Sequence, residues 1–599
     1  MIYHCEDHTC NYWDEGEKLP ERCPQCGRKL LRANEADMTG DDWTALGNTL
    51  WDAEASDKKR MVDCFRKAAY LGSAWGVCNL GICMEQGNGV EADPVQAFWL
   101  YQQAVEMGSL NAVCCLGVCY QYGIGTAPDA KQAAELYCKA AEYGSPRGQM
   151  LLARAFHDGI GVEADAAEAV YWVRAAAYQR YGEGMHRLGV CYEYGDGVEQ
   201  NWERAVHWFR EAAESGVGVA MTDLGYCYEK GCGVEQSWEQ AFSWYRRGAE
   251  CGNPVSMSNL GLCYQMGYGV EQNWQEAIKW YEQGAQCGDL QSMHNLACCY
   301  EGGEGVEQNE DRAFYWYRRS AEGGNGSAMC NLGRCYKRGY GVEQNWQEAV
   351  KWYEQGAQCG NLQSMHNLAC CYEHGEGVEQ NMTEAIRWYT AAAEGGNADD
   401  MYELGWQYDH GEGVEQDMKK AICWYERAAE QNHPAAMNSL GECYAMGRGV
   451  PRDLETAMEW YRRAAELGEA MADYNMGWHL EQAGKLSEAY THYRKAADGN
   501  DDSAWWALGR FYENGVVVAQ DGKEARRCYE TGEKLGSVKC KMRLARCKLL
   551  GIGGRRAKKA GLDLCRQALE LAKESSEKED YGYEAEMNLL RRTIAENES

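Results

Sequence analysis

Residues 188–216 read LGVCYEYGDGVEQNWERAVHWFREAAESG, and residues 224–252 repeat the pattern as LGYCYEKGCGVEQSWEQAFSWYRRGAECG. The tetrad Gly-x-Gly-Val inside this stretch, which is Gly-Ile-Gly-Thr in one copy, begins at Gly87 and recurs every 36 residues up to Gly447. It occurs eleven times without an insertion or a deletion. A fixed period of this length predicts an array of repeated structural units.

Recurring columns predict that each unit is a pair of helices. In the first helix, Leu188, the glycine after it and Tyr192 share one face. The two tetrad glycines end this helix because glycine accepts a positive φ. Six residues after the tetrad opens stands an Asn, Asp or Ser, such as Asn201, which is a typical N-cap residue for the second helix. The spacing of Asn273 and Glu276 predicts a capping box.

The second helix has its own apolar column. Ala and Trp stand three residues apart on one face, as in Ala277 and Trp280. Nine copies carry this tryptophan, from Trp172 to Trp460. We expect the tryptophan column to form the core between repeats.

Each unit is therefore predicted to be a helical hairpin whose apolar face is covered by the next hairpin. Counting the Leu/Met-Gly/Ala pairs gives about fifteen hairpins, with less regular units at Leu46 and at Met476, Leu508 and Leu544. We predict an all-α fold, a right-handed superhelical α-solenoid over residues 34–570. A small module over residues 1–33 precedes it, and a charged capping helix or tail over residues 571–599 follows it.

The unit LGxCYExGxGVEQNxxxAxxWYxxAAExG resembles the Sel1-like repeat, a relative of the tetratricopeptide repeat, over roughly residues 40–570. The resemblance implies an adaptor that holds peptide or protein partners in the concave groove of a superhelix. It therefore implies a non-enzymatic protein-interaction scaffold, and it favours a bacterial source. It does not identify the partner.

One subgroup of that family suggests an alternative, a β-lactamase-like hydrolase. Its members are secreted, cysteine-rich bacterial proteins with a disulfide in each repeat. The corresponding columns here hold alanine and methionine, as in Ala285 and Met293, which argues against this reading. The cysteines that recur lie three residues after the Leu, from Cys83 to Cys443. We expect them to pack as small apolar side chains, with a thiol- or metal-binding role as the other alternative.

Composition limits the class of partner and the compartment. The chain has 60 Lys and Arg against 91 Asp and Glu, and its net charge of −31 argues against nucleic-acid binding. No stretch approaches the ~20 apolar residues that span a bilayer, so no membrane association is expected. The N-terminus shows no signal peptide, and thirty cysteines without an export signal indicate reduced thiols. We therefore predict a cytoplasmic protein.

The first 33 residues lie outside the repeat and carry paired cysteines. Cys23-Pro-Gln-Cys26-Gly has a zinc-knuckle spacing, and Cys5 and Cys10 form a second, less regular pair. We predict one structural zinc ion bound by Cys5, Cys10, Cys23 and Cys26. His8 in place of Cys10 is one alternative, and a module without metal is another. The segment resembles bacterial zinc-ribbon modules, in which the metal supplies most of the folding energy.

The repeats carry no recognisable catalytic motif. The sequence contains no Gly-Lys-Ser/Thr phosphate loop, no HExxH and no GxSxG, so we predict that the chain is not an enzyme. His294 and His366 occupy equivalent positions in MHNLACCY. Because residues 270–309 and 342–381 are nearly identical copies, this recurrence reflects duplication and does not indicate two catalytic bases.

Partner binding is expected on the first helix of each hairpin. Its outward positions lie two residues before, two after and five after the Leu. Acidic and aromatic residues there favour a basic or aromatic-rich peptide or protein, and solvated helix faces are the alternative. The candidate partner-binding residues are His186, Glu193, Glu229, His294, Glu301, His366, Glu373 and Tyr402.

Overall fold

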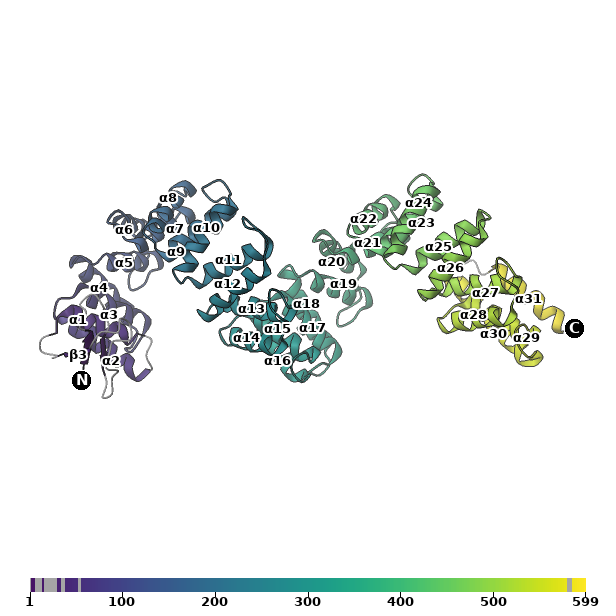
Figure 1. Ribbon diagram of the computed structural model, residues 1–599, viewed down its shortest axis with the longest axis horizontal. Coiled ribbons are helices and arrows are strands. Elements are labelled where there is room, and N and C mark those ends of the chain that lie inside the picture. Colours follow the sequence, from purple (N-terminus) through teal and green to yellow (C-terminus); the bar gives the residue numbers. More distant parts are fainter. Residues whose placement is uncertain are drawn as a thin grey trace. The chain divides into compact units, whose positions relative to one another are not determined.

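The protein is described by a computed structural model that covers residues 2–5, 13–15, 30–33, 38–51, 55–578 and 584–598 (Figure 1). The chain separates into two units, residues 1–309 and residues 310–599. In its described parts the first unit contains β1 (Ile2–Cys5), β2 (Trp13–Glu15), β3 (Leu30–Ala33), α1 (Gly40–Thr49), α2 (Ala55–Tyr70), α3 (Ala74–Gln86), α4 (Pro94–Glu106), α5 (Leu110–Tyr122), α6 (Ala130–Glu142), α7 (Pro146–Asp158), α8 (Ala166–Tyr178), α9 (Gly182–Tyr194), α10 (Trp202–Glu214), α11 (Gly218–Lys230), α12 (Trp238–Glu250), α13 (Pro254–Met266), α14 (Trp274–Gln286) and α15 (Leu290–Gly302). The described parts of the second unit contain α16 (Glu310–Glu322), α17 (Gly326–Arg338), α18 (Trp346–Gln358), α19 (Leu362–His374), α20 (Met382–Glu394), α21 (Ala398–His410), α22 (Met418–Glu430), α23 (Pro434–Met446), α24 (Leu454–Glu466), α25 (Ala470–Gln482), α26 (Leu486–Asp498), α27 (Asp502–Asn514), α28 (Gly522–Lys534), α29 (Val538–Leu550), α30 (Lys558–Lys578) and α31 (Glu584–Glu598).

Consecutive helices pair into hairpins, as the sequence predicts. Within the described residues, α1–α14 form seven hairpins in the first unit and α17–α30 form seven in the second. Successive hairpins pack on one another, and in several places the first helices of neighbouring hairpins also meet, as α11 and α13 do. The repeat that contains α15 and α16 spans the boundary between the units. The prediction of a helical-repeat solenoid is confirmed.

The N-terminal strands form a small antiparallel sheet in the order β2-β1-β3. Ile2 pairs with Glu15 on one side of β1 and with Ala33 on the other. At the far end of β1, Cys5 pairs with Leu30. The sheet therefore places β1 between the two later strands, and β2 lies close to α1.

The hairpin of α11 and α12 shows how the columns fold. Leu224 and Ala241 are completely buried between the two helices. The small residue after the leucine is required, because a Cβ on Gly225 would lie 2.6 Å from the Cε1 atom of Tyr245. The Tyr245 ring therefore lies directly on the backbone of the first helix. The same contact recurs in most hairpins and brings the two helices close together.

The loop between the two helices is fixed by its glycines. Gly231 ends α11 with a φ of +75°, and Gly233 has a φ of +69°. Gly233 also packs against the preceding hairpin, since a Cβ there would lie 2.5 Å from the carbonyl carbon of Trp202. The first glycine thus turns the chain, and the second allows neighbouring hairpins to approach.

Three further hydrogen bonds fix this loop and the start of the second helix. The Ser237 amide donates to the Tyr228 carbonyl at 2.9 Å, while its side chain accepts from the Gln240 amide as the N-cap. Gln236 Nε2 donates to the Glu229 carbonyl at 2.8 Å and so satisfies the C-terminal end of α11. The glutamine recurs throughout the GVEQ loops, and the sequence analysis did not assign it this role.

The predicted capping box is only half formed. The Asn273 side chain accepts from the Glu276 amide at 3.1 Å, as expected of an N-cap. However, the Asn273 amide donates to the Tyr264 carbonyl, and the Glu276 carboxylate pairs with Lys279 at 3.2 Å. The loop takes the donor that a capping box would use.

The prediction that the tryptophan column forms the core between repeats is wrong, because the tryptophans lie at the edge of the core and the next residue fills it. Every tryptophan from Trp172 to Trp460 in that column is only half-buried. The residue that follows it is the core aromatic, and in most hairpins this is a tyrosine with almost no exposure, such as Tyr245 and Tyr281. The tryptophans pack on the edge of the core, and several lie under an arginine, as Trp244 does under Arg247.

The recurring cysteines pack in the core, as predicted. All nine members of the column, from Cys83 to Cys443, are buried. Burial raises the pKa of the Cys227 and Cys263 thiols to about 12, so these thiols stay protonated. Among the described helices, none has both the length and the apolar composition needed to cross a bilayer.

Candidate partner-binding surface

All eight candidate residues lie on first helices of hairpins, and each is half-buried. The first unit holds His186, Glu193, Glu229, His294 and Glu301. The second unit holds His366, Glu373 and Tyr402.

Two of the candidate glutamates are held by the second helix of their own hairpin. The Tyr245 hydroxyl donates to Glu229 at 2.8 Å, and the Tyr389 hydroxyl donates to Glu373 at 2.6 Å. Both tyrosines are almost fully buried. The carboxylates are thus fixed at the edge of the hairpin core. Sequence reasoning missed this bond, although the tyrosine stands sixteen residues after each glutamate and the spacing could have indicated it.

In the first unit, α9 and α11 bring His186, Glu193 and Asp223 together. His186 Nε2 lies 2.6 Å from Asp223 Oδ2. Desolvation by burial, and next the charge of Asp223, raise the pKa of the Glu193 carboxyl, while His186 opposes the shift. The result is a partly desolvated acidic group that an added cation would stabilise.

The other candidates of the first unit lie on different helices. His294 Nε2 lies 3.7 Å from Cys298 Sγ on α15. The Glu301 carbonyl accepts from Gln308 Nε2 at 3.0 Å, which is the loop contact found in the other hairpins. The helices α11 and α13 lie between α9 and α15 in the stack, so the structure does not join these residues to the His186 group.

In the second unit, His366 lies at the centre of a polar group. Its Nδ1 lies 2.7 Å from Asp400 Oδ1, and its Nε2 lies 3.6 Å from Cys370 Sγ. The hydrogen bonds with Asp400, which is fully buried, and with Cys370 raise the pKa of His366 to about 10. Desolvation and then the charge of Glu373 raise the pKa of Glu403 beside it. The structure thus joins His366 and Glu373 in one acidic neighbourhood.

Tyr402 belongs to a contact between α21 and α23. Its ring stacks on His433 with ring centroids 5.0 Å apart and an interplanar angle of 22°. His433 caps α23 by accepting from the Ala436 amide, and its Nε2 lies 3.2 Å from Asp399. The stacking fixes the orientation of the Tyr402 ring on the first-helix face.

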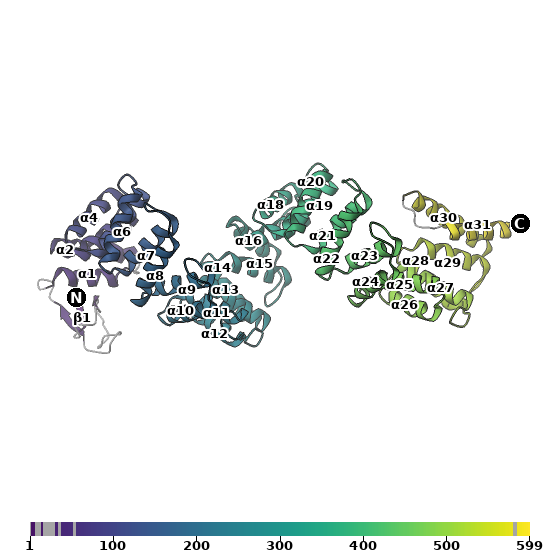
Figure 2. The ribbon, with the colours of Figure 1, turned by 90° about the horizontal axis from the view of Figure 1, so that it is seen from above.

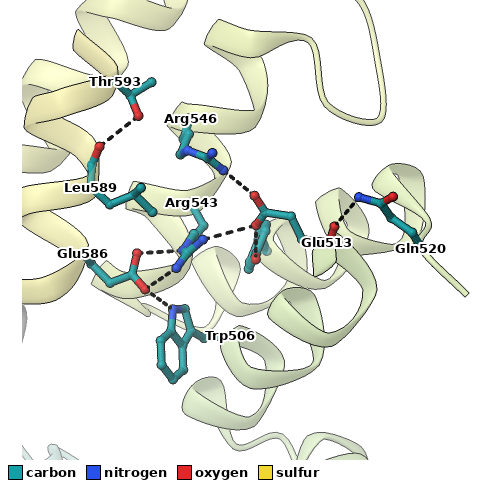
Figure 3. A network of polar contacts seen from close by, with 9 residues as sticks. Trp506, Glu513, Gln520, Arg543, Arg546, Glu586, Leu589 and Thr593 are labelled. Carbon is teal, nitrogen blue, oxygen red and sulfur yellow. Dashed lines mark hydrogen bonds and ion pairs between the residues drawn. The ribbon is translucent and has the colours of Figure 1, made fainter. Parts of the chain in front are cut away.

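In the last hairpins a helix of the chain itself packs on this face. The helix α31 lies beside α29 and α30 (Figure 2). Its Glu586 accepts from Arg543 Nη2 at 2.7 Å and from Trp506 Nε1 at 3.2 Å (Figure 3). Arg543 and Arg546 also pair with Glu513. Trp506 stands in the column that holds His186, His366 and Tyr402 upstream, so this column can accept a helix.

The predicted zinc ligands fall almost entirely outside the described residues. Cys10, Cys23 and Cys26 lie there, as does His8, and of Cys5 only the backbone at the end of β1 is described. In the parts of the chain whose side chains are placed, no group of three or more His, Cys, Asp and Glu residues is arranged to hold a metal ion. The zinc site remains a prediction.

Stacked helical hairpins with a polar face on their first helices define a repeat protein of the tetratricopeptide type. The family model of the Sel1 repeat matches residues 76–109 and 112–145, nine consecutive segments over residues 146–469, and residues 470–501 and 504–537. The chain therefore belongs to the Sel1 repeat family.

Two solved structures illustrate the likeness. The protective antigen c5321 of uropathogenic Escherichia coli strains, which displays an SLR fold, is 32% identical, with 75% of this chain and 97% of that chain covered and a TM-score of 0.50. A Sel1 repeat protein from Oxalobacter formigenes is 33% identical, with 41% and 96% covered and a TM-score of 0.38. No curated protein sequence matches the chain.

Membership of the Sel1 repeat family indicates a function in protein interaction. Sel1 repeat proteins are protein-interaction scaffolds, and this chain is a scaffold of that kind. The family is typically non-enzymatic. The comparisons give no support to the hydrolase alternative.

Proposed function

We propose that the scaffold binds a basic peptide or helix on the first-helix face of its hairpins. The observation that carries this proposal is the docking of α31, because Glu586 binds Trp506 of α27, which stands in a candidate column, and Arg543 of α29, which stands one residue before the Leu of its helix. Upstream, the column of Arg543 holds Asp223 and Glu403, and the column of Glu513 holds Glu193, Glu229 and Glu373, so the complementary partner is cationic.

The electrostatics of the two acidic groups support a cationic partner. In the first unit the pKa of Glu193 is raised by burial and by Asp223, and in the second unit the pKa of Glu403 is raised by burial and by Glu373. A lysine or arginine placed beside either group offsets the repulsion between its carboxylates. The net charge of −31 also attracts a basic partner at long range, an effect that salt screens.

A pair of peptides tests this proposal on the full chain. One is a lysine-rich amphipathic helical peptide, and the other has glutamate in place of each lysine. We expect the basic peptide to bind about tenfold more tightly at low salt and to lose this advantage at high salt. Fluorescence anisotropy of the labelled peptides measures both affinities. Equal affinity of the two peptides would contradict the proposal.

Matched variants locate the binding surface. Replacing Glu193 by Gln and Asp223 by Asn removes the acidic group of α9 and α11, and we expect several-fold weaker binding of the basic peptide. Glu203→Gln removes one charge from an exposed position on the second helix α10 and serves as the control. A loss in the control as large as in the double variant would place the effect in the overall charge and not in the surface.

We also propose that the N-terminal module binds one structural zinc ion through Cys5, Cys10, Cys23 and Cys26, with His8 as the alternative to Cys10. The strand register supports Cys5 and Cys26 as two members of this set, because Cys26 stands four residues before Leu30, which pairs with Cys5, and four residues span at most about 14 Å. Zinc analysis of the purified chain should give one ion, and Cys23→Ser should lose it. A metal-free chain would overturn this assignment.

We further propose a non-enzymatic role in a reducing, cytoplasmic environment, without nucleic-acid binding. The core packing of the Cys227 and Cys263 thiols supports reduced cysteines, and the alanine and methionine columns lack the disulfide of the secreted relatives. A thiol titration of the unfolded chain should account for all thirty cysteines once zinc is removed. Nitrocefin should not be hydrolysed, and hydrolysis above background would favour the hydrolase.

A further inference from the structure

One hairpin of the first unit departs from the aromatic core column. In α4, α6, α12 and α14 the residue four positions after the core alanine is a buried tyrosine, whose ring packs on the glycine after the leucine of the first helix. These pairs are Tyr101 with Gly81, Tyr137 with Gly117, Tyr245 with Gly225 and Tyr281 with Gly261. In α8 the same position holds Val173. The hairpin of α7 and α8 therefore lacks the ring that fills its neighbours.

A cavity of about 390 Å³ lies at this place, between α7, α8 and α9. Ala153, Val170 and Val173 form part of its apolar wall, and all three are almost fully buried. The volume lies within the range of about 300–1,000 Å³ that is usual for ligand pockets. The smaller side chain in the tyrosine column thus leaves an open pocket at the place that a tyrosine ring fills in the four hairpins named above.

The polar end of the cavity matches the hydroxyl of the missing ring. In other hairpins this hydroxyl donates to the residue five positions after the leucine, as Tyr101 does to Glu85 at 2.6 Å and Tyr245 to Glu229 at 2.8 Å. In the open hairpin this position is His157, which lines the cavity.

The histidine brings two carboxylates to the same end of the cavity. His157 Nδ1 lies 2.6 Å from Asp158 Oδ1, and its Nε2 lies 3.2 Å from Asp196 Oδ2. The hydrogen bond with His157 lowers the pKa of Asp158, so this carboxylate stays ionised and able to accept a hydrogen bond. Arg154 and Arg187 also line this end, with Arg154 Nε 3.4 Å from Asp158 Oδ2 and Arg187 Nη2 3.9 Å from Asp196 Oδ2. Each carboxylate oxygen has two lone pairs, so it can accept a phenol hydroxyl beside these partners.

We propose that the cavity between α7, α8 and α9 binds the phenol ring of a tyrosine side chain supplied by a partner protein. The ring occupies the place that Tyr101 or Tyr245 occupies in its own hairpin, and its hydroxyl donates to the carboxylates beside His157. Ala153 stands where those hairpins have glycine, but Ala369 packs in the same core as the buried Tyr389 and shows that an alanine Cβ and a ring fit together. The partner's tyrosine rests on the proposed scaffold function, whereas binding of a free phenol tests the cavity alone.

The probe for the cavity is p-cresol, which has the ring and hydroxyl of tyrosine, and the experiment uses the full chain. We expect saturable binding at one site by calorimetry, with increased hydrogen-exchange protection confined to α7–α9. Toluene lacks the hydroxyl and should bind at least about tenfold more weakly, because it desolvates the polar end of the cavity without donating a hydrogen bond to the carboxylates. Equal binding of toluene, or protection elsewhere in the chain, would overturn the proposal.

Val173→Tyr restores the column residue and fills the cavity, so p-cresol binding should fall at least about tenfold. The matched control is Phe209→Tyr, which introduces the same side chain in the same column one hairpin later, where a ring is already present. The control should bind p-cresol like the unaltered chain. Full binding by Val173→Tyr would refute the proposal, and the protection pattern of the unaltered chain decides the matter even if a variant folds poorly.

N-acetyltyrosinamide and N-acetylphenylalaninamide test the protein-derived ligand. We expect the tyrosine compound to bind with the same protection pattern as p-cresol and the phenylalanine compound to bind more weakly. Binding of p-cresol without the tyrosine amide would exclude a side chain as the ligand. Loss of basic-peptide binding with p-cresol binding intact would reject the proposed function and leave the cavity standing.

Discussion

The hairpin of α11 and α12 and the hairpin of α7 and α8 have the same helix lengths and loop length, yet one is filled and the other is open. In the first, Tyr245 packs on Gly225 and bonds to Glu229. In the second, Val173 occupies the same column beside a cavity of about 390 Å³. The repeat therefore sets the backbone through its leucines, alanines and glycines, and one aromatic position decides whether the interior of a hairpin is accessible.

The largest expected effect comes from opening the filled hairpin. Tyr245→Val removes a buried ring and its hydrogen bond, so we expect the local free energy of unfolding of α11–α13 to fall by about 2–4 kcal/mol. Native-state hydrogen exchange measures this locally, which suits a repeat array whose units need not unfold together. Unchanged protection of these helices would show that the ring is not what holds the hairpin closed.

Closing the open hairpin gives the opposite sign. Val173→Tyr fills an existing cavity, and we expect α7–α9 to gain about 0.5–2 kcal/mol of local stability, as cavity-filling substitutions commonly do. Hydrogen exchange of the same helices provides the measurement, and α11–α13 serve as the internal reference. A loss of protection would mean that the surrounding side chains leave no room for the ring.

The hydroxyl can be separated from the ring in the filled hairpin. Tyr245→Phe keeps the ring on Gly225 and removes only the donor to Glu229, so the expected loss of local stability is about 1 kcal/mol. The same exchange experiment should place this variant between the unaltered chain and Tyr245→Val. A Phe variant as damaged as the Val variant would assign the stability to the hydrogen bond.

The smallest effect is a pH dependence confined to the open hairpin. His157 lowers the pKa of Asp158, so the stability from this pair is present above the unfolded value of about 3.9 and is lost as the pH falls through the folded value. Because the pair is well exposed, we expect less than about 0.5 kcal/mol. Comparing the unaltered chain with His157→Gln between pH 6 and pH 3 should show the difference shrink as the pH falls. A difference that stays constant over this range would exclude this pair.

The repeated columns made the fold predictable from the sequence. Leu224 and Ala241 were predicted to be buried and Ser237 to be an N-cap, and the structure confirms all three. The burial of the tryptophan column was not predictable in this way, because a large apolar side chain can lie either in the core or at its edge. The tyrosine after the tryptophan points toward the glycine of the first helix and is buried there. Which of the two aromatic residues is buried depends on how the two helices pack, and the sequence of one helix does not show this.

The sequence predicted the positions of the candidate residues but not the side chains that hold them. The columns located Glu229 and His366, but not the buried Tyr245 or Asp400 that hold them, since those partners come from other helices. The sequence does indicate the place of the cavity, because Val173 interrupts a column of tyrosines. The volume of the cavity and the polar residues at its end are known only from the structure.

The loop contacts also explain why the unit length stays constant across the eleven Gly-x-Gly-Val tetrads. Ser237, Gln236 and Gly233 each meet a partner at a fixed separation, in the same hairpin or in the one before. One added or deleted residue would disrupt all three at once, whereas a whole 36-residue block carries its own set and leaves the joints on either side intact. Such a chain can therefore gain or lose complete 36-residue repeats without disrupting the loop contacts of the repeats that remain.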